Sequence, residues 1–204
     1  MDRSLSRRSF VAVAVLAVLA VPFGFSSAFA AEPLMRLSAF TISQEGSGGQ
    51  ATVLQINIDR WSTPEEIAGL KALLVEKGDA ALLAALEKIK PRCGIIATNN
   101  SMGWDVHGAI QTPLPGGGQK IVLITNRPMS FARAAGDAKS TDYQFTLAEI
   151  RLDKDNGRKG EGKLAQSVGI TYNATTKGLE LTNYGALPLA LSDVVVNWPK
   201  EQKK

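Results

Sequence analysis

Alternating apolar and polar positions predict β-strands along most of the chain after residue 33. In residues 51–61, for example, Leu54 and Ile56 alternate with Gln55 and Asn57. This period of two is typical of a strand with one buried face. Glycine, proline and polar residues separate the strand-like segments, as expected for turns. The predicted strands are residues 34–43, 51–61, 93–98, 101–112, 119–126, 142–153, 163–172, 178–184 and 187–198.

Residues 63–91 show helical periodicity instead. Thr63 and Glu66 form a Thr-x-x-Glu capping box, and Pro64 suits the first helical position. Apolar residues recur three or four positions apart on both sides of Gly78, which predicts two helices separated by that glycine. Two amphipathic helices need an apolar partner, so we expect the pair to cover a sheet.

Two strands depart from simple alternation. Residues 121–124 are all apolar, which predicts a central strand covered on both faces. In residues 142–153 the apolar positions change phase, because Phe145 and Ile150 belong to opposite faces. This change predicts a bulge near Ala148 or Glu149, or a strand that leaves one sheet surface for another.

The order of these elements predicts an α+β fold. Strands follow strands through short polar turns, which favours antiparallel pairing. The two helices interrupt this series between the second and third strands. We therefore expect a curved, mostly antiparallel sheet, either a half-barrel or a sandwich, with an inserted helical hairpin.

Residues 1–30 have the composition of a signal peptide. Arg7 and Arg8 belong to a basic start, an apolar run follows, and residues 28–30 read Ala-Phe-Ala, a typical cleavage site. The arginine pair fits either the twin-arginine or the general secretory route. The expected product is a single domain of residues 31–204 in the periplasm or outside the cell, not inserted in the membrane after cleavage.

Charge and cysteine content exclude several classes of function. Removing Arg3, Arg7, Arg8 and Asp2 leaves 20 basic and 18 acidic residues, a net charge of +2, which argues against nucleic-acid binding. The chain has one histidine and one cysteine, too few for a typical zinc site, so we expect neither a metal nor another cofactor. Cys93 is either buried or a reactive thiol, and the apolar pair that follows it favours burial.

Residues 101–107 contain the most suggestive side chains. On a strand, Ser101, Asp105 and His107 share one face, opposite Trp104. Ser101 and His107 are about 20 Å apart along a strand, too far for activation of a nucleophile. Asp105 and His107 are close enough to interact, and we expect them to form a solvent-facing polar pair.

Arg127 adds a fourth candidate at the end of residues 119–126. An arginine at a strand end either holds an acidic ligand or forms a local salt bridge, here with Glu149 or Asp142. The candidate ligand-binding residues are thus Trp104, Asp105, His107 and Arg127, and no residue is assigned a catalytic role.

Three motifs carry a family resemblance. They are residues 117–128 (Gly-Gly-Gln-Lys-Ile-Val-Leu-Ile-Thr-Asn-Arg-Pro), residues 142–151 with their Asp-Tyr-Gln-Phe-Thr start, and residues 160–164. Together they resemble a set of small exported bacterial proteins without an established function. The resemblance implies a single exported domain and adds no mechanism.

The sequence thus predicts an exported binding or accessory protein whose partner is an unknown small molecule or protein. An enzyme is the less favoured class. One alternative is a small hydrolase that uses Asp105 and His107. Another is a small-molecule or lipid site between the sheet and the helix pair, which requires an apolar pocket with a few polar groups.

Overall fold

The computed structural model describes residues 32–43, 50–99, 101–129, 144–154, 159–173, 178–184 and 187–197. The predicted signal peptide and its cleavage site lie outside these residues, as does nearly all of the connector that follows Met129. The elements in chain order are β1 (Met35–Ser43), β2 (Gln50–Ile58), α1 (Pro64–Lys77), α2 (Asp79–Leu86), β3 (Gly94–Thr98), β4 (Trp104–Pro113), β5 (Gln119–Thr125), β6 (Phe145–Leu152), β7 (Lys159–Asn173), β8 (Gly178–Tyr184) and β9 (Leu189–Asn197).

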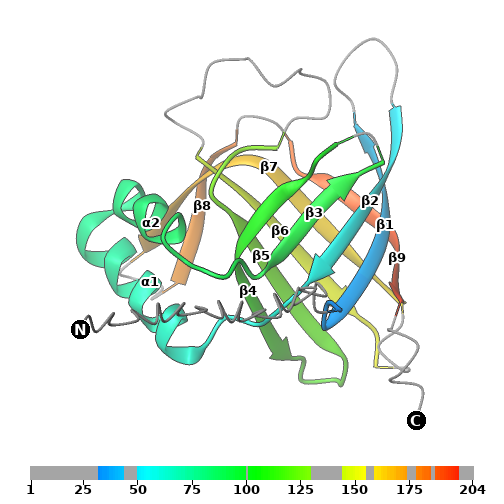
Figure 1. Ribbon diagram of the computed structural model, residues 1–204, viewed down its shortest axis with the longest axis horizontal. Coiled ribbons are helices and arrows are strands. Elements are labelled where there is room, and N and C mark those ends of the chain that lie inside the picture. The colour runs from blue at the N-terminus through cyan, green and yellow to red at the C-terminus, as the bar shows by residue number, and fades with distance from the viewer. Residues whose placement is uncertain are drawn as a thin grey trace, which may run out of the picture. The chain divides into compact units, whose positions relative to one another are not determined.

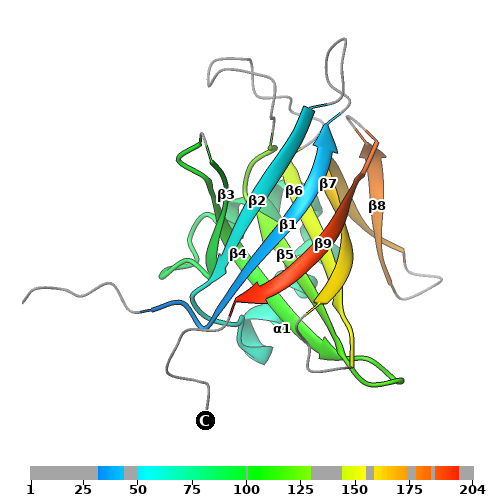
Figure 2. The same cartoon turned by 90° about the vertical axis from the view of Figure 1, so that its right-hand side faces the viewer.

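Eight of the strands close into an antiparallel barrel (Figures 1 and 2). The strands are ordered β6-β5-β4-β3-β2-β1-β9-β7, and β6 also pairs with β7. The predicted half-barrel or sandwich with an inserted helical hairpin is therefore wrong, and the fold is mostly sheet. Local alternation defines each strand but carries no information on the pairing of β1 with β9, which brings together the first and last strands of the chain.

β7 makes the closure possible because it is long, at 15 residues. One edge of β7 pairs with β6, while the other edge pairs first with β9 and then with β8. The sequence pattern predicted this strand to begin at Lys163, but it begins at Lys159. Gly160 and Gly162 pass close to carbonyl oxygens of β6, where a Cβ atom would collide with the backbone.

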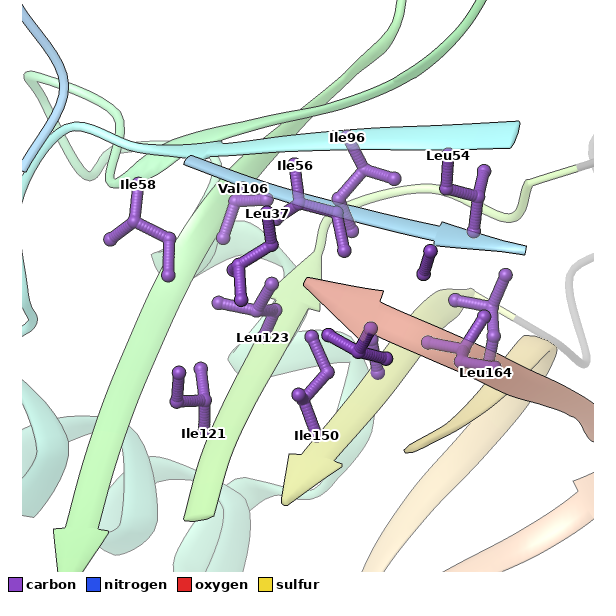
Figure 3. Close-up of a cluster of buried hydrophobic side chains, with 14 of the residues drawn as sticks. Leu37, Leu54, Ile56, Ile58, Ile96, Val106, Ile121, Leu123, Ile150 and Leu164 are labelled. Carbon is purple, nitrogen blue, oxygen red and sulfur yellow. The ribbon is translucent and has the colours of Figure 1, made fainter. Parts of the chain in front are cut away.

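Aliphatic side chains fill the barrel. Along β1, Met35, Leu37 and Ala39 point inwards, and Arg36 and Phe40 point outwards. The side chains labelled in Figure 3 come from β1 to β7, and each is at most 1% exposed. The labelled residues of this interior cluster are Leu37, Leu54, Ile56, Ile58, Ile96, Val106, Ile121, Leu123, Ile150 and Leu164.

A second apolar cluster lies outside the barrel, beneath the two helices. Thr63 caps α1 with the predicted box, since its hydroxyl accepts from the Glu66 N–H and the Glu66 carboxylate accepts from the Thr63 N–H. Leu82 and Leu86 of α2 belong to this cluster, and Phe145 lies on the barrel side. Both helices contact β7 (Figure 1).

The two covered faces explain the apolar run in β5. Ile121 and Leu123 are fully buried in the barrel interior, whereas Val122 and Ile124 belong to the outer cluster. The prediction of a strand covered on both faces is confirmed.

The same coverage explains the phase change in β6. The bulge predicted near Ala148 or Glu149 is wrong, because β6 keeps unbroken register with both neighbours from Leu147 onwards. Phe145 lies in the outer cluster and Ile150 in the interior cluster. The alternation never breaks, and only the covered side of the strand changes.

Candidate functional site

Trp104 and Asp105 lie on opposite sides of β4. Trp104 is half-buried and packs against the interior cluster. Asp105 accepts a hydrogen bond from Arg92, with 2.6 Å between Oδ1 and Nη1, and Arg92 Nε lies 3.7 Å from Asp59 Oδ2. Asp105 is thus engaged by an arginine, and the described residues contain no hydrogen bond between it and His107.

His107 is buried rather than solvent-facing, with 9% of its surface exposed. The β4–β5 register passes from Val106 opposite Thr125 to Gly108 opposite Ile124, so His107 is the extra residue of a bulge. Its Nδ1 has no hydrogen-bond partner in the described part of the chain. The expectation of a surface histidine was wrong because a bulge interrupts the simple alternation on which it rested.

Cys93 is buried, as predicted, and is held in its thiol form. The thiol lies 3.6 Å from the Ser62 hydroxyl and donates to the His107 carbonyl oxygen at 3.3 Å. Burial raises the pKa of the Cys93 thiol, and the contact with Ser62 offsets only part of this rise. Because the thiolate is the reactive form, this environment favours a structural role for the cysteine.

The Arg127 side chain bonds to the backbone beside the neighbouring strand, β4. Its Nη2 donates to the Gly103 carbonyl oxygen at 2.8 Å, just before β4. Glu149, one of its predicted partners, pairs instead with Arg151 at 2.9 Å. Asp142, the other, lies outside the described residues. Arg127 therefore ties the segment after β5 to the turn before β4.

Sequence reasoning missed a set of polar side chains at this same end of the barrel. Here β1, β3 and β5 finish and β2, β4, β6 and β9 begin, at the upper end in Figure 1. The members other than Gln166 lie in phase with residues of the interior cluster on their own strands, and thus face inwards. Gln166 lies at the irregular point of the β6–β7 pairing, where its backbone oxygen accepts from the Thr146 hydroxyl. This polar layer consists of Thr41, Thr52, Thr98, Trp104, Thr125, Thr146 and Gln166.

Two hydroxyls of the polar layer hold the chain segment that follows β5. The Thr125 hydroxyl donates to the Arg127 carbonyl at 2.6 Å and accepts from the Thr146 N–H at 3.1 Å. The Thr146 hydroxyl donates to the Gln166 carbonyl at 2.7 Å and accepts from the Met129 N–H at 2.8 Å. Met129 then joins the interior cluster with 1% exposure. These two hydroxyls therefore serve the fold.

Two further members of the layer carry polar atoms that the described structure leaves without a partner. Thr41 is 1% exposed and Gln166 is 2% exposed. The Thr41 Oγ1 and the Gln166 Nε2 are buried and have no hydrogen-bond partner among the described residues. Buried polar side chains are nearly always hydrogen-bonded, so these two atoms require an explanation.

A weak signal of this layer exists in the sequence. Thr41, Thr125 and Thr146 each interrupt an apolar alternation at one end of a strand. That pattern also fits a strand that simply runs out into solvent. Only closure of the barrel turns these strand ends into one buried layer.

The region between helices and barrel, predicted as an alternative ligand site, is occupied by side chains. Leu82 and Leu86 of α2 are at most 4% exposed and belong to one cluster with Phe145 and Val168, which are fully buried. Apolar packing fills this region, and Lys71 of α1 lies over the Tyr172 ring, 5.8 Å from its centroid.

Comparison with known proteins identifies no relative of this chain. No protein-family model, curated protein or solved structure matches it. The resemblance to small exported bacterial proteins therefore stays a prediction. In the described part of the chain, no three His, Cys, Asp or Glu side chains are grouped so as to hold a metal ion. Neither described helix has the length and apolar character needed to span a bilayer.

Proposed function

We propose that this protein is an exported, non-catalytic binding protein that holds a small molecule at the polar layer of its barrel. The observation that carries the proposal is the pair of unpartnered atoms, Thr41 Oγ1 and Gln166 Nε2. A buried donor or acceptor without a partner costs about 1–3 kcal/mol, so a molecule that bonded to both would recover a large part of that cost.

A binding role also agrees with the surroundings of the other polar residues. Asp105 is engaged by Arg92, and the environment of Cys93 favours the thiol over the thiolate. A hydrolase needs a nucleophile beside its base. No hydroxyl of the described residues bonds to His107 Nδ1. The polar layer is the better candidate because its free atoms point to a ligand without requiring a reaction.

Export is the part of the proposal that rests on sequence alone. Residues 1–30 carry the basic start, apolar run and Ala-Phe-Ala site of a signal peptide. N-terminal sequencing of the protein from the fraction outside the inner membrane should begin near Ala31. Recovery of a chain that still begins at Met1 in that fraction would contradict this part.

Native mass spectrometry of protein purified without refolding from its source tests the binding role. We expect a bound small molecule in the natural protein and its loss from the double variant Thr41→Val, Gln166→Met. The matched control is Thr112→Val, Gln55→Met, which makes the same changes at exposed positions of β4 and β2. Both variants should show the circular dichroism of the natural protein.

Two results would overturn the proposal. One is a small molecule that stays bound to the double variant at Thr41 and Gln166, since the ligand would then lie elsewhere. The other is a high-resolution crystal structure in which ordered water alone bonds to both atoms, because water also satisfies buried polar groups.

A further inference from the structure

We infer that the ligand of the polar layer is an uncharged molecule that presents an acceptor oxygen, such as a carbonyl, to the side-chain amide of Gln166. This inference rests on the proposed function and names the chemical class of its ligand. It draws on three features of the described layer: the unpartnered amide nitrogen of Gln166, the lack of charged members and the packing below it.

The unpartnered amide nitrogen of Gln166 determines whether the ligand must donate or accept a hydrogen bond. Gln166 Nε2 is a donor only, so its partner must be an acceptor. The backbone oxygen of the same residue already accepts from the Met129 N–H at 2.9 Å and from the Thr146 hydroxyl at 2.7 Å. The Thr41 hydroxyl can donate or accept. An oxygen with two lone pairs satisfies the amide, and the hydroxyl adapts to whichever group lies beside it.

The described members of the layer offer no counter-charge to an ionic ligand. Its members carry hydroxyl, amide and indole groups, and none is ionised. Arg127 follows Thr125 by two residues, but its side chain is exposed and its Nη2 donates to the Gly103 carbonyl. A charge transferred into such a layer would lose its hydration without gaining a counter-charge, which is far more costly than burying a neutral dipole.

The packing below the layer limits how far a ligand can enter. Next to the layer along their strands lie Ala39, Leu54, Ile96, Leu123 and Leu164, each at most 1% exposed. Figure 3 shows labelled members of this set directed towards the barrel axis. Trp104 lies half-buried on the same level. The bound group therefore stays within the layer, beside an aromatic side chain. This position suits a small, compact molecule.

Four probes of similar size test the class directly. Cyclopentanone carries an acceptor oxygen, methylenecyclopentane has the same shape without it, and cyclopentanecarboxylate and cyclopentylammonium carry opposite charges. Binding is followed in full-length mature protein through the NMR resonances of the Gln166 side-chain amide. We expect cyclopentanone to shift these resonances and to bind at least about tenfold more tightly than the other three, as one buried hydrogen bond allows.

The Gln166→Met variant should remove that tenfold preference, whereas the Gln55→Met control should keep it. Three results would overturn the inferred class. Cyclopentanone and methylenecyclopentane could bind equally well, or either ion could bind more tightly than cyclopentanone. The third result is that no probe shifts the Gln166 amide resonances. A charged molecule that co-purifies with the protein and is lost on substitution of Thr41 and Gln166 would overturn the class alone. A bound mass that survives those substitutions would overturn the proposed function itself.

Discussion

The Thr146 hydroxyl lies 2.7 Å from the backbone carbonyl oxygen of Gln166, and this contact joins β6 to β7 at the irregular point of their pairing. The same hydroxyl accepts from the Met129 N–H at 2.8 Å. One side chain thus links two strands to the segment that follows β5. The link fixes the backbone of Gln166, whose side chain provides one of the two free atoms.

Removing the Thr146 hydroxyl should therefore destabilise the barrel. We expect Thr146→Val to lower the free energy of unfolding by about 1–3 kcal/mol, because its buried partners lose a hydrogen bond. Urea unfolding at equilibrium measures the effect. Thr146→Ser should recover most of the loss, and Thr112→Val at an exposed site should change little. If Thr146→Val had the same free energy of unfolding as the natural protein, the barrel would not need this link.

The interior of β5 should be among the most sensitive places to truncation. Leu123 is fully buried in the interior cluster, so Leu123→Ala should cost about 2–5 kcal/mol through lost burial and the cavity left behind. Leu187, which is 80% exposed, provides a matched control whose truncation should cost under about 0.5 kcal/mol. Similar costs at both positions would contradict the barrel interior described above.

Cys93 should make stability depend on alkaline pH. Burial raises the pKa of the folded-state thiol above its ordinary value of 9.0, so only the unfolded chain loses this proton readily. The stabilisation is fully present below the unfolded pKa and is lost as pH rises through the folded pKa. Between pH 7 and about pH 10, the natural protein should lose more stability than Cys93→Ala. If stability fell with pH to the same extent in the natural protein and in Cys93→Ala, this prediction would be refuted.

Glu66 should make stability depend on acidic pH. Hydrogen bonds from Arg60 and from the Thr63 N–H lower the pKa of the Glu66 carboxyl below its ordinary value of 4.5. The resulting stabilisation is present above the unfolded pKa and is lost as pH falls through the folded pKa.

Chemical unfolding of the natural protein and of Glu66→Gln tests this dependence. The difference in stability should be clear at pH 7 and should shrink below about pH 4. Glu65→Gln, in the same helical turn but without these partners in the described structure, should show a smaller change with pH. A difference for Glu66→Gln that stayed constant over this range would contradict an ionic contribution.

Local sequence determined the elements of this protein. The capping box of Thr63 and Glu66 is made as predicted, and Gly78 separates the two helices as the pattern indicated. The apolar run of residues 121–124 correctly predicted a strand covered on both faces. Each of these features depends on residues within a few positions of one another, which is why a pattern along the chain suffices to predict them.

Tertiary structure alone decided the closure of the barrel and the character of its end. The pairing of β1 with β9 brings together residues about 160 positions apart, as in Arg36 opposite Asn197, and no local period encodes it. The bulge at His107 re-aims one side chain against the alternation around it. Thr41 and Gln166 lie on strands distant in the chain and become one buried layer only because the sheet closes. A strand-end threonine has the same sequence signature in solvent and in a barrel, so its environment is fixed by the strands that surround it.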